Sequence, residues 1–168
     1  MSLNASARIY LEKLTTGDAP FMLRLLNTAG WIKYIGDRQV RDLIAAEEYL
    51  DRILHNPAIN YWVIRLRSTG EPIGIVTFIY RDALPGPDLG FALLEEHTGK
   101  GFGYEAARLL LQELDVAGRG QTVCAVTTAK NTPSIALLVR LGFIWSRTIR
   151  LDGHDVELYQ LAAGGRNP

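Results

Sequence analysis

The chain has little of several features that define particular protein classes. Its 168 residues include one cysteine, Cys124, which excludes an intrachain disulfide and a cysteine-based zinc site. The three histidines, His55, His97 and His154, lie far apart without the spacing of metal ligands, so we expect no metal. The 18 basic residues balance the 18 acidic ones, so no overall field attracts nucleic acid or an anionic membrane.

Long apolar runs are also missing. No run approaches the roughly 20 residues of a membrane span, and the N-terminus lacks the apolar region of a signal peptide. We therefore expect a cytoplasmic protein with no membrane partner. The composition is that of a globular protein, with 48% hydrophobic and 21% charged residues. The length predicts one domain, which we place at 1–163, with a disordered tail at 164–168.

Hydrophobic periodicity predicts a mixed α/β order of elements. Strands are expected at 7–14, 60–67, 72–80, 87–94, 122–128, 143–151 and 154–161. Helices are expected at 19–28, 40–54, 103–117 and 132–141, the last with Thr132 as its cap and Gly142 as its stop. Turn-rich segments join the second, third and fourth strands, which indicates an antiparallel meander. We expect helices on both sides of the sheet.

One stretch is not explained by secondary structure alone. In "HTGKGFGYEAARLLL" (97–111), three alternating glycines lead directly into a helix, and each destabilises the chain unless its backbone freedom is used. A bare-backbone turn before a helix N-terminus suits an anion such as phosphate, because free N–H groups and the helix dipole face it. A tight strand-to-helix turn without a ligand explains the glycines equally well. The spacing fits neither a Walker loop nor a dinucleotide fingerprint.

A second motif decides between these interpretations. The segment "NTPSIALLVRLGF" (131–143) follows the buried strand predicted at 122–128. Together with "DLGFALLEEHTGKGFGYEAARLLL" (88–111), it closely resembles the GNAT N-acetyltransferase superfamily, and most nearly the ribosomal-protein N-terminal acetyltransferases. The resemblance covers about 87–145 in motif detail and the full length in element order. It implies an α/β GNAT fold, with about four helices around a mostly antiparallel sheet that has a V-shaped splay between its fourth and fifth strands.

The resemblance also implies an acetyl-CoA-dependent N-acetyltransferase without a metal. Its loop would bind the pyrophosphate of acetyl-CoA through backbone N–H groups, with Lys100 adding a charge. The residues that supply those N–H groups would be Gly101, Phe102, Gly103 and Tyr104. The backbone of the strand around Phe91 and Leu93 would pair with the pantetheine arm inside the splay and polarise the thioester carbonyl. Asn131 would hydrogen-bond the same arm.

Two side chains are expected to carry the chemistry. Ser134 would lie near the thioester sulfur and protonate the departing thiolate, while Asp88 would accept a proton from the amine, directly or through water. The chain departs from the family pattern at Leu138, where many members have a tyrosine acid, and at Thr98, where many have Gln or Arg. Each candidate also has a structural explanation: Asp88 as a strand end, and Ser134 as a first-turn helix residue.

The motifs do not specify the acceptor. We expect a protein N-terminal amine or a small-molecule amine that attacks the thioester directly in a ternary complex. Segments near 29–40 and 81–86 would form its pocket, with Trp31, Tyr34 and Trp62 as candidate lining. A homodimer stays possible. Two other functions stay open: an acyl-CoA-binding sensor or interaction module with little turnover, which the missing tyrosine favours, and a non-enzymatic scaffold that does not bind CoA.

Overall fold

A computed structural model describes residues 3–114 and 119–161 of the chain. The strands are β1 (Leu3–Ala5), β2 (Ile9–Lys13), β3 (Ile59–Leu66), β4 (Pro72–Ile79), β5 (Asp88–Leu93), β6 (Val123–Thr127), β7 (Ile144–Leu151) and β8 (His154–Leu161). The α-helices are α1 (Ala19–Leu26), α2 (Ala29–Tyr34), α3 (Leu43–Leu54), α4 (Phe102–Glu113) and α5 (Thr132–Arg140), and short 3₁₀ turns are η1 (Thr16–Asp18) and η2 (Glu95–His97). In these ranges, no helix is long and apolar enough to cross a membrane.

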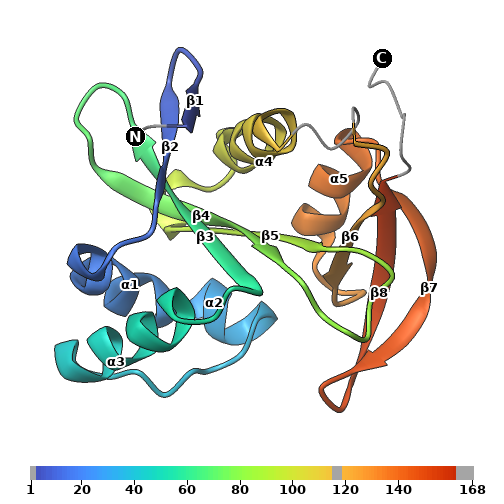
Figure 1. Ribbon diagram of the computed structural model, residues 1–168, viewed down its shortest axis with the longest axis horizontal. Helices are drawn as coiled ribbons and strands as arrows, with labels where there is room; N and C mark the ends of the chain where they lie inside the picture. The colour runs from blue at the N-terminus through green and yellow to red at the C-terminus, as the bar shows by residue number, and fades with distance from the viewer. Residues whose placement is uncertain (1–2, 115–118, 162–168) are drawn as a thin grey trace.

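The strands form one sheet in the order β1-β2-β3-β4-β5-β6-β8-β7. Every neighbouring pair is antiparallel except β5 and β6, which are parallel and share one register pair, Asp88 with Cys124. Beyond that point the two strands diverge (Figure 1). This confirms the predicted GNAT fold, with the splay between the fourth and fifth strands of the predicted series.

Helices cover both faces of the sheet, as predicted (Figure 1). On one face, α4 and α5 pack through residues such as Ala106, Leu110 and Leu138 against β2 to β6. On the other face, α1, α2 and α3 pack against alternate residues of β3 and β4, including Val63 and Ile75. Because side chains alternate along a strand, β5 contributes to both sides, and its divergence from β6 opens the sheet between the two helical layers.

Capping residues set the helix ends, and here the sequence-based bounds needed correction. Asn131, and not Thr132, is the N-cap of α5. The α3 helix starts at Leu43 instead of 40, because the Asp42 side chain accepts a hydrogen bond from the Ala45 N–H. The predicted stop at Gly142 is confirmed by a Schellman pair of hydrogen bonds after α5.

Other elements also differ from the sequence analysis. The α4 helix ends at Glu113 instead of 117, and residues 115–118 lie outside the described residues. The described part of the chain has five α-helices, close to the expected number of about four, and the short α2 was not among the helices placed from the sequence. Strand β1 was missed, because three residues are too few to show a period. The predicted tail at 164–168 also lies outside the described residues.

Candidate active site

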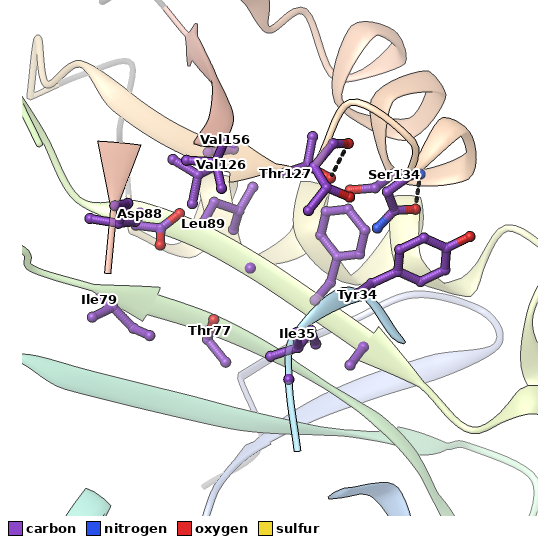
Figure 2. A pocket seen from close by; sticks show the side chains of 18 of the residues that line it. Tyr34, Ile35, Thr77, Ile79, Asp88, Leu89, Val126, Thr127, Ser134 and Val156 are labelled. Atoms are coloured by element: carbon purple, nitrogen blue, oxygen red, sulfur yellow. Dashed lines mark hydrogen bonds between the residues drawn. The ribbon is translucent and has the colours of Figure 1, made fainter. Parts of the chain in front are cut away.

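The divergence of β5 from β6 forms a cleft of about 780 Å³. The candidates Asp88, Phe91, Asn131 and Ser134 all line it. Figure 2 shows Asp88 and Ser134 toward opposite ends of this lining, on β5 and on the first turn of α5. Leu93 and residues 100–104 are not part of the lining. The structure therefore brings together the two candidate catalytic residues and leaves the glycine loop as a separate, neighbouring feature.

The glycine loop has the backbone that its composition predicts. Gly99 and Gly101 have φ angles of +71° and +84°, in the left-handed region where a side chain would be strained. Gly101 is the N-cap of α4. Gly103 is needed for packing: a Cβ there would lie 3.0 Å from Leu137 Cδ1 and 3.7 Å from Leu93 Cδ1. The glycines thus fold the loop and seat α4 tightly beside β5 and α5.

The start of α4 presents free hydrogen-bond donors. The first intrahelical bond runs from the Glu105 N–H to the Gly101 carbonyl, 3.1 Å. In the described part of the chain, no residue accepts a hydrogen bond from the N–H groups of 101–104. These groups and the positive end of the α4 dipole favour an anion here, and the exposed Lys100 adds to the charge. The geometry fits a pyrophosphate group.

Arg8, between β1 and β2, contacts this loop and supports it. The sequence analysis missed this contact. The Arg8 guanidinium donates to Glu105, 2.9 Å from Nε, and to the Lys100 carbonyl, 3.0 Å. It also lies 4.5 Å from the centroid of the Phe102 ring. Glu105 accepts a further hydrogen bond from the Ser6 hydroxyl. No local pattern signals this cluster, because more than 90 residues separate its members in sequence.

Asp88 is the buried acid of the cleft. It is 6% exposed and forms an ion pair with Arg81, with 3.0 Å between Arg81 Nε and Asp88 Oδ2. Burial disfavours the charged carboxylate more than Arg81 favours it, and the pKa of Asp88 rises to about 6. A carboxylate with a raised pKa is a better proton acceptor near neutral pH. The strand-end explanation is also correct in part, because Asp88 is the first residue of β5.

Asn131 and Ser134 are joined at the start of α5. The Asn131 side chain accepts a hydrogen bond from the Ser134 backbone N–H, 3.3 Å, which leaves the Ser134 hydroxyl free of the capping role. One turn further on, Leu138 is 1% exposed and also lines the cleft. A helical turn separates positions four residues apart on one face, so Ser134 and Leu138 face the same side. Of these two side chains, only that of Ser134 has a polar atom.

The rest of the lining comes from α2, the loop after β4 and the β7–β8 hairpin. Trp31 and Tyr34 line the cleft, as predicted, and so does Arg81. Trp62 does not: it is 3% exposed in the core, with Lys13 Nζ 3.8 Å from its ring centroid. The prediction that Trp62 lines the pocket was wrong, because its side chain packs from the central strand β3 into the core.

The hairpin was missed as part of the site. Residues 151–156, at the turn between β7 and β8, supply Leu151, His154 and Val156 to the lining. The sequence analysis expected both strands of this hairpin, at 143–151 and 154–161. It gave no sign that the turn lines the cleft, since this position depends on how β5 and β6 diverge.

Comparison with known proteins agrees with this fold. Residues 8–144 match the model of the acetyltransferase (GNAT) domain. The chain therefore belongs to the GNAT acetyltransferase family, and its enzyme class is acetyl-CoA-dependent acetyltransferase. It is 28% identical over 141 residues to an uncharacterized N-acetyltransferase p20 of Bacillus licheniformis, covering 81% of this chain and 79% of that one.

Two solved structures show the same fold. The RimL ribosomal L7/L12 α-N-protein acetyltransferase in complex with coenzyme A has a TM-score of 0.83 at 16% identity, covering 99% of this chain and all of that one. The aminoglycoside acetyltransferase AAC(6')-Ib in complex with coenzyme A has a TM-score of 0.76 at 19% identity, covering 92% and 94%. The names of these proteins describe different acceptors, so the fold alone does not identify the acceptor here.

Proposed function

We propose that the chain transfers the acetyl group of acetyl-CoA to a primary amine while both substrates are bound in the cleft. The observation that supports this most is the single cleft that contains both a buried acid, Asp88, and a free hydroxyl, Ser134, in the gap between two diverging strands. Direct transfer requires a proton acceptor on the amine side and a proton donor on the sulfur side. The two residues lie toward opposite ends, as that reaction requires (Figure 2).

The cofactor side would be held mainly by backbone. The N–H groups of 101–104 would bind the pyrophosphate, with a smaller contribution from Lys100. The edges of β5 and β6 that face the splay have few partners beyond the pair of Asp88 and Cys124, so backbone around Phe91 and Leu93 is available to the pantetheine arm. Asn131 would hydrogen-bond the same arm. Acetyl-CoA supplies the acetyl group as an activated thioester.

Asp88 would act as the proton acceptor. An acceptor amine is mostly protonated at neutral pH and must lose a proton before its lone pair can attack. With a pKa of about 6, Asp88 is mainly ionised at pH 7 and still basic enough to take that proton. Arg81 keeps the carboxylate in place through the ion pair at 3.0 Å.

Ser134 would assist departure of the thiolate. A thiol has a pKa near 8–9, so the leaving sulfur needs only a hydrogen bond and a nearby proton. Ser134 is the polar residue on the helix face that it shares with Leu138. The rest of the rate would come from holding the two substrates in contact.

The amine would bind against the part of the lining that α2, Arg81 and the β7–β8 hairpin supply. This part mixes aromatic, apolar and charged side chains, which suits either a protein N-terminus or a small-molecule amine. A spermidine N-acetyltransferase chimera also shares the fold, with a TM-score of 0.74 at 19% identity. The likeness to proteins with three kinds of named acceptor supports amine acetylation and leaves the acceptor to experiment.

An acceptor screen tests this proposal. The protein is mixed with acetyl-CoA and, in separate reactions, alaninamide, a short peptide with a free α-amine, spermidine or an aminoglycoside. Release of free thiol is followed, and acetylated product is identified by mass spectrometry. We expect many turnovers per protein with at least one amine. Tight CoA binding without turnover on any amine would instead support the sensor function, which Leu138 in place of a tyrosine acid favours.

A further inference from the structure

Thr77 is a buried polar residue that the mechanism above does not use. It lies on β4, is 6% exposed and lines the cleft. Thr127, a threonine of the same cleft, donates its hydroxyl to the Thr128 carbonyl, 3.5 Å away. The Thr77 hydroxyl makes no hydrogen bond to any residue that the structure describes. The buried side-chain polar atoms without a partner in the described residues are Trp31 Nε1 and Trp62 Nε1, so the Thr77 hydroxyl oxygen is reached from the cleft. A hydroxyl that is open to the cleft and has no partner within the chain is available to a bound molecule.

The strand register places this hydroxyl beside Asp88. Thr77 pairs with Gly90, and Ile79 pairs with Asp88, so all four residues lie on one face of the sheet. Thr77 and Asp88 are diagonal neighbours, about 7–8 Å apart between backbones. Figure 2 shows both on neighbouring strands, with the Thr77 hydroxyl directed toward β5.

Gly90 makes room for the hydroxyl. A Cβ at Gly90 would lie 2.6 Å from Thr77 Oγ1, closer than any ordinary contact. Since Gly90 has no side chain, the space between Thr77 and Asp88 stays open to the cleft. An amine nitrogen there, with hydrogen bonds of about 3 Å, reaches both oxygen groups at once.

We propose that Thr77 is an acceptor-binding residue, whose hydroxyl accepts a hydrogen bond from the amine that Asp88 deprotonates; this rests on the proposed function. A neutral primary amine has two N–H groups and one lone pair. One N–H donates to Thr77 and the other to Asp88, which leaves the lone pair for the acetyl carbon. Asp88 first takes one proton from the bound ammonium and passes it to solvent. The N–C bond then forms as the C–S bond breaks, a second proton passes from the nitrogen to Asp88, and the sulfur takes up a proton from solvent through Ser134.

This arrangement selects primary over secondary amines. An N-methyl group replaces one of the two N–H donors, so a secondary amine satisfies either Thr77 or Asp88 and leaves the other without a hydrogen bond. The selectivity belongs to the site and is separate from the ordinary steric effect of the methyl group on the reaction. Removing the Thr77 hydroxyl removes the selectivity that comes from the site and leaves the steric effect of the methyl group.

The experiment compares Thr77→Val, which keeps the shape without the hydroxyl, with Thr77→Ser, which keeps the hydroxyl. The substrate is the primary amine with the highest turnover in the acceptor screen. We expect Thr77→Val to lower kcat/KM for that amine about 10- to 30-fold, with acetyl-CoA affinity unchanged within about twofold. Thr77→Ser keeps activity within about threefold of wild type. Thr148→Val, a threonine on β7 outside the lining, is the control and is expected to match wild type.

A second readout separates binding from structure. The ratio of kcat/KM for the primary amine to that for its N-methyl derivative should fall about tenfold in Thr77→Val and stay constant in Thr77→Ser. Equal activity and equal ratios in Thr77→Val and wild type overturn the inference while the proposed function stands. If wild type releases no thiol with any amine, the inference about Thr77 and the proposed function both fail. Should Thr77→Val not fold, Gly90→Ala displaces the same hydroxyl and must show the same loss.

Discussion

The glycine loop, where we propose that the cofactor binds, and the cleft, where we propose that the acceptor binds, are built in different ways. The loop consists mostly of backbone, with positive-φ glycines at 99 and 101, free N–H groups at the start of α4, and an ion pair between Arg8 and Glu105 beside it. The cleft is lined by side chains that include those of α2, of the loop after β4 and of the β7–β8 hairpin. Backbone donors depend on loop geometry, whereas side chains change with each substitution. This explains how one fold can keep acetyl-CoA and accept different amines.

The largest effect should come from Asp88, the buried acid of the cleft. Asp88→Asn removes the proton acceptor, and we expect kcat to fall on the order of 100-fold, with KM for acetyl-CoA within a few fold. The wild-type rate should also fall as pH drops through about 6, because protonated Asp88 accepts no proton. Asp82→Asn, in the exposed loop before β5, is the control. A normal kcat with an unshifted pH profile would leave Asp88 only its role in the strand.

The same variant should change the pH dependence of stability. The pKa of Asp88 is raised to about 6, so the folded state favours the protonated carboxyl, and wild type loses stability as pH rises from about 4 to about 6. Asn does not titrate. From pH 5 to pH 7.5 we expect Asp88→Asn to gain on the order of 1 kcal/mol of unfolding free energy relative to wild type, measured by urea titration. If the difference in unfolding free energy between Asp88→Asn and wild type stayed constant with pH, this would argue against a buried charge at Asp88.

Ser134→Ala should have the next largest effect. We expect kcat to fall about 10- to 100-fold, in line with about 1.4–2.7 kcal/mol of transition-state stabilisation, and acetyl-CoA affinity to stay within a few fold. Asn131 caps α5 through the Ser134 backbone N–H, so this cap survives the substitution. Thr132→Ala, in the same turn and exposed, is the matched control. Wild-type kcat where chemistry limits the rate would mean that water or the amine protonates the sulfur.

Gly103→Val tests the glycine loop and the N–H groups at the start of α4. We expect CoA affinity to fall by at least tenfold, about 1.4 kcal/mol. A Cβ at this buried position meets Leu137 at 3.0 Å, so valine shifts the first turn of α4 and its N–H groups. Gly30 occupies the same second helical position in α2, where a Cβ has no neighbour within 4 Å. Gly30→Val should therefore bind CoA within about twofold of wild type in a calorimetric titration. Equal affinities of the two variants would contradict the backbone site.

The smallest effect should come from Lys100. Its side chain is exposed, and such charge contacts stabilise by roughly 0–1 kcal/mol, so Lys100→Ala should weaken CoA binding less than about fivefold. The Lys100 carbonyl, which accepts from Arg8, is unaffected. If Lys100→Ala abolished binding while Gly101→Ala, strained at its φ of +84°, did not, side-chain charge and not backbone would hold the phosphate.

The same division explains what the sequence could predict. Local patterns and the family resemblance predicted the glycine loop, the splay and the positions of Asp88 and Ser134. Features that are built from one continuous stretch of backbone leave a local sequence signal. The roles of Arg8, Thr77 and the β7–β8 turn in the site left no such signal, since they depend on strand register and on contacts between distant segments. Trp62 shows the converse error, in which an aromatic residue near the expected site lay in the core.

Two-substrate initial-rate kinetics test the central claim, that both substrates meet in one cleft, most directly. The rate of thiol release is measured while acetyl-CoA and the best acceptor amine are varied together. Direct transfer in a ternary complex predicts double-reciprocal lines that intersect, with no acetylated protein detected by mass spectrometry in the absence of the amine. Parallel lines together with a stoichiometric acetyl-protein would contradict the account, because the acetyl group would then reach the amine through a covalent protein intermediate.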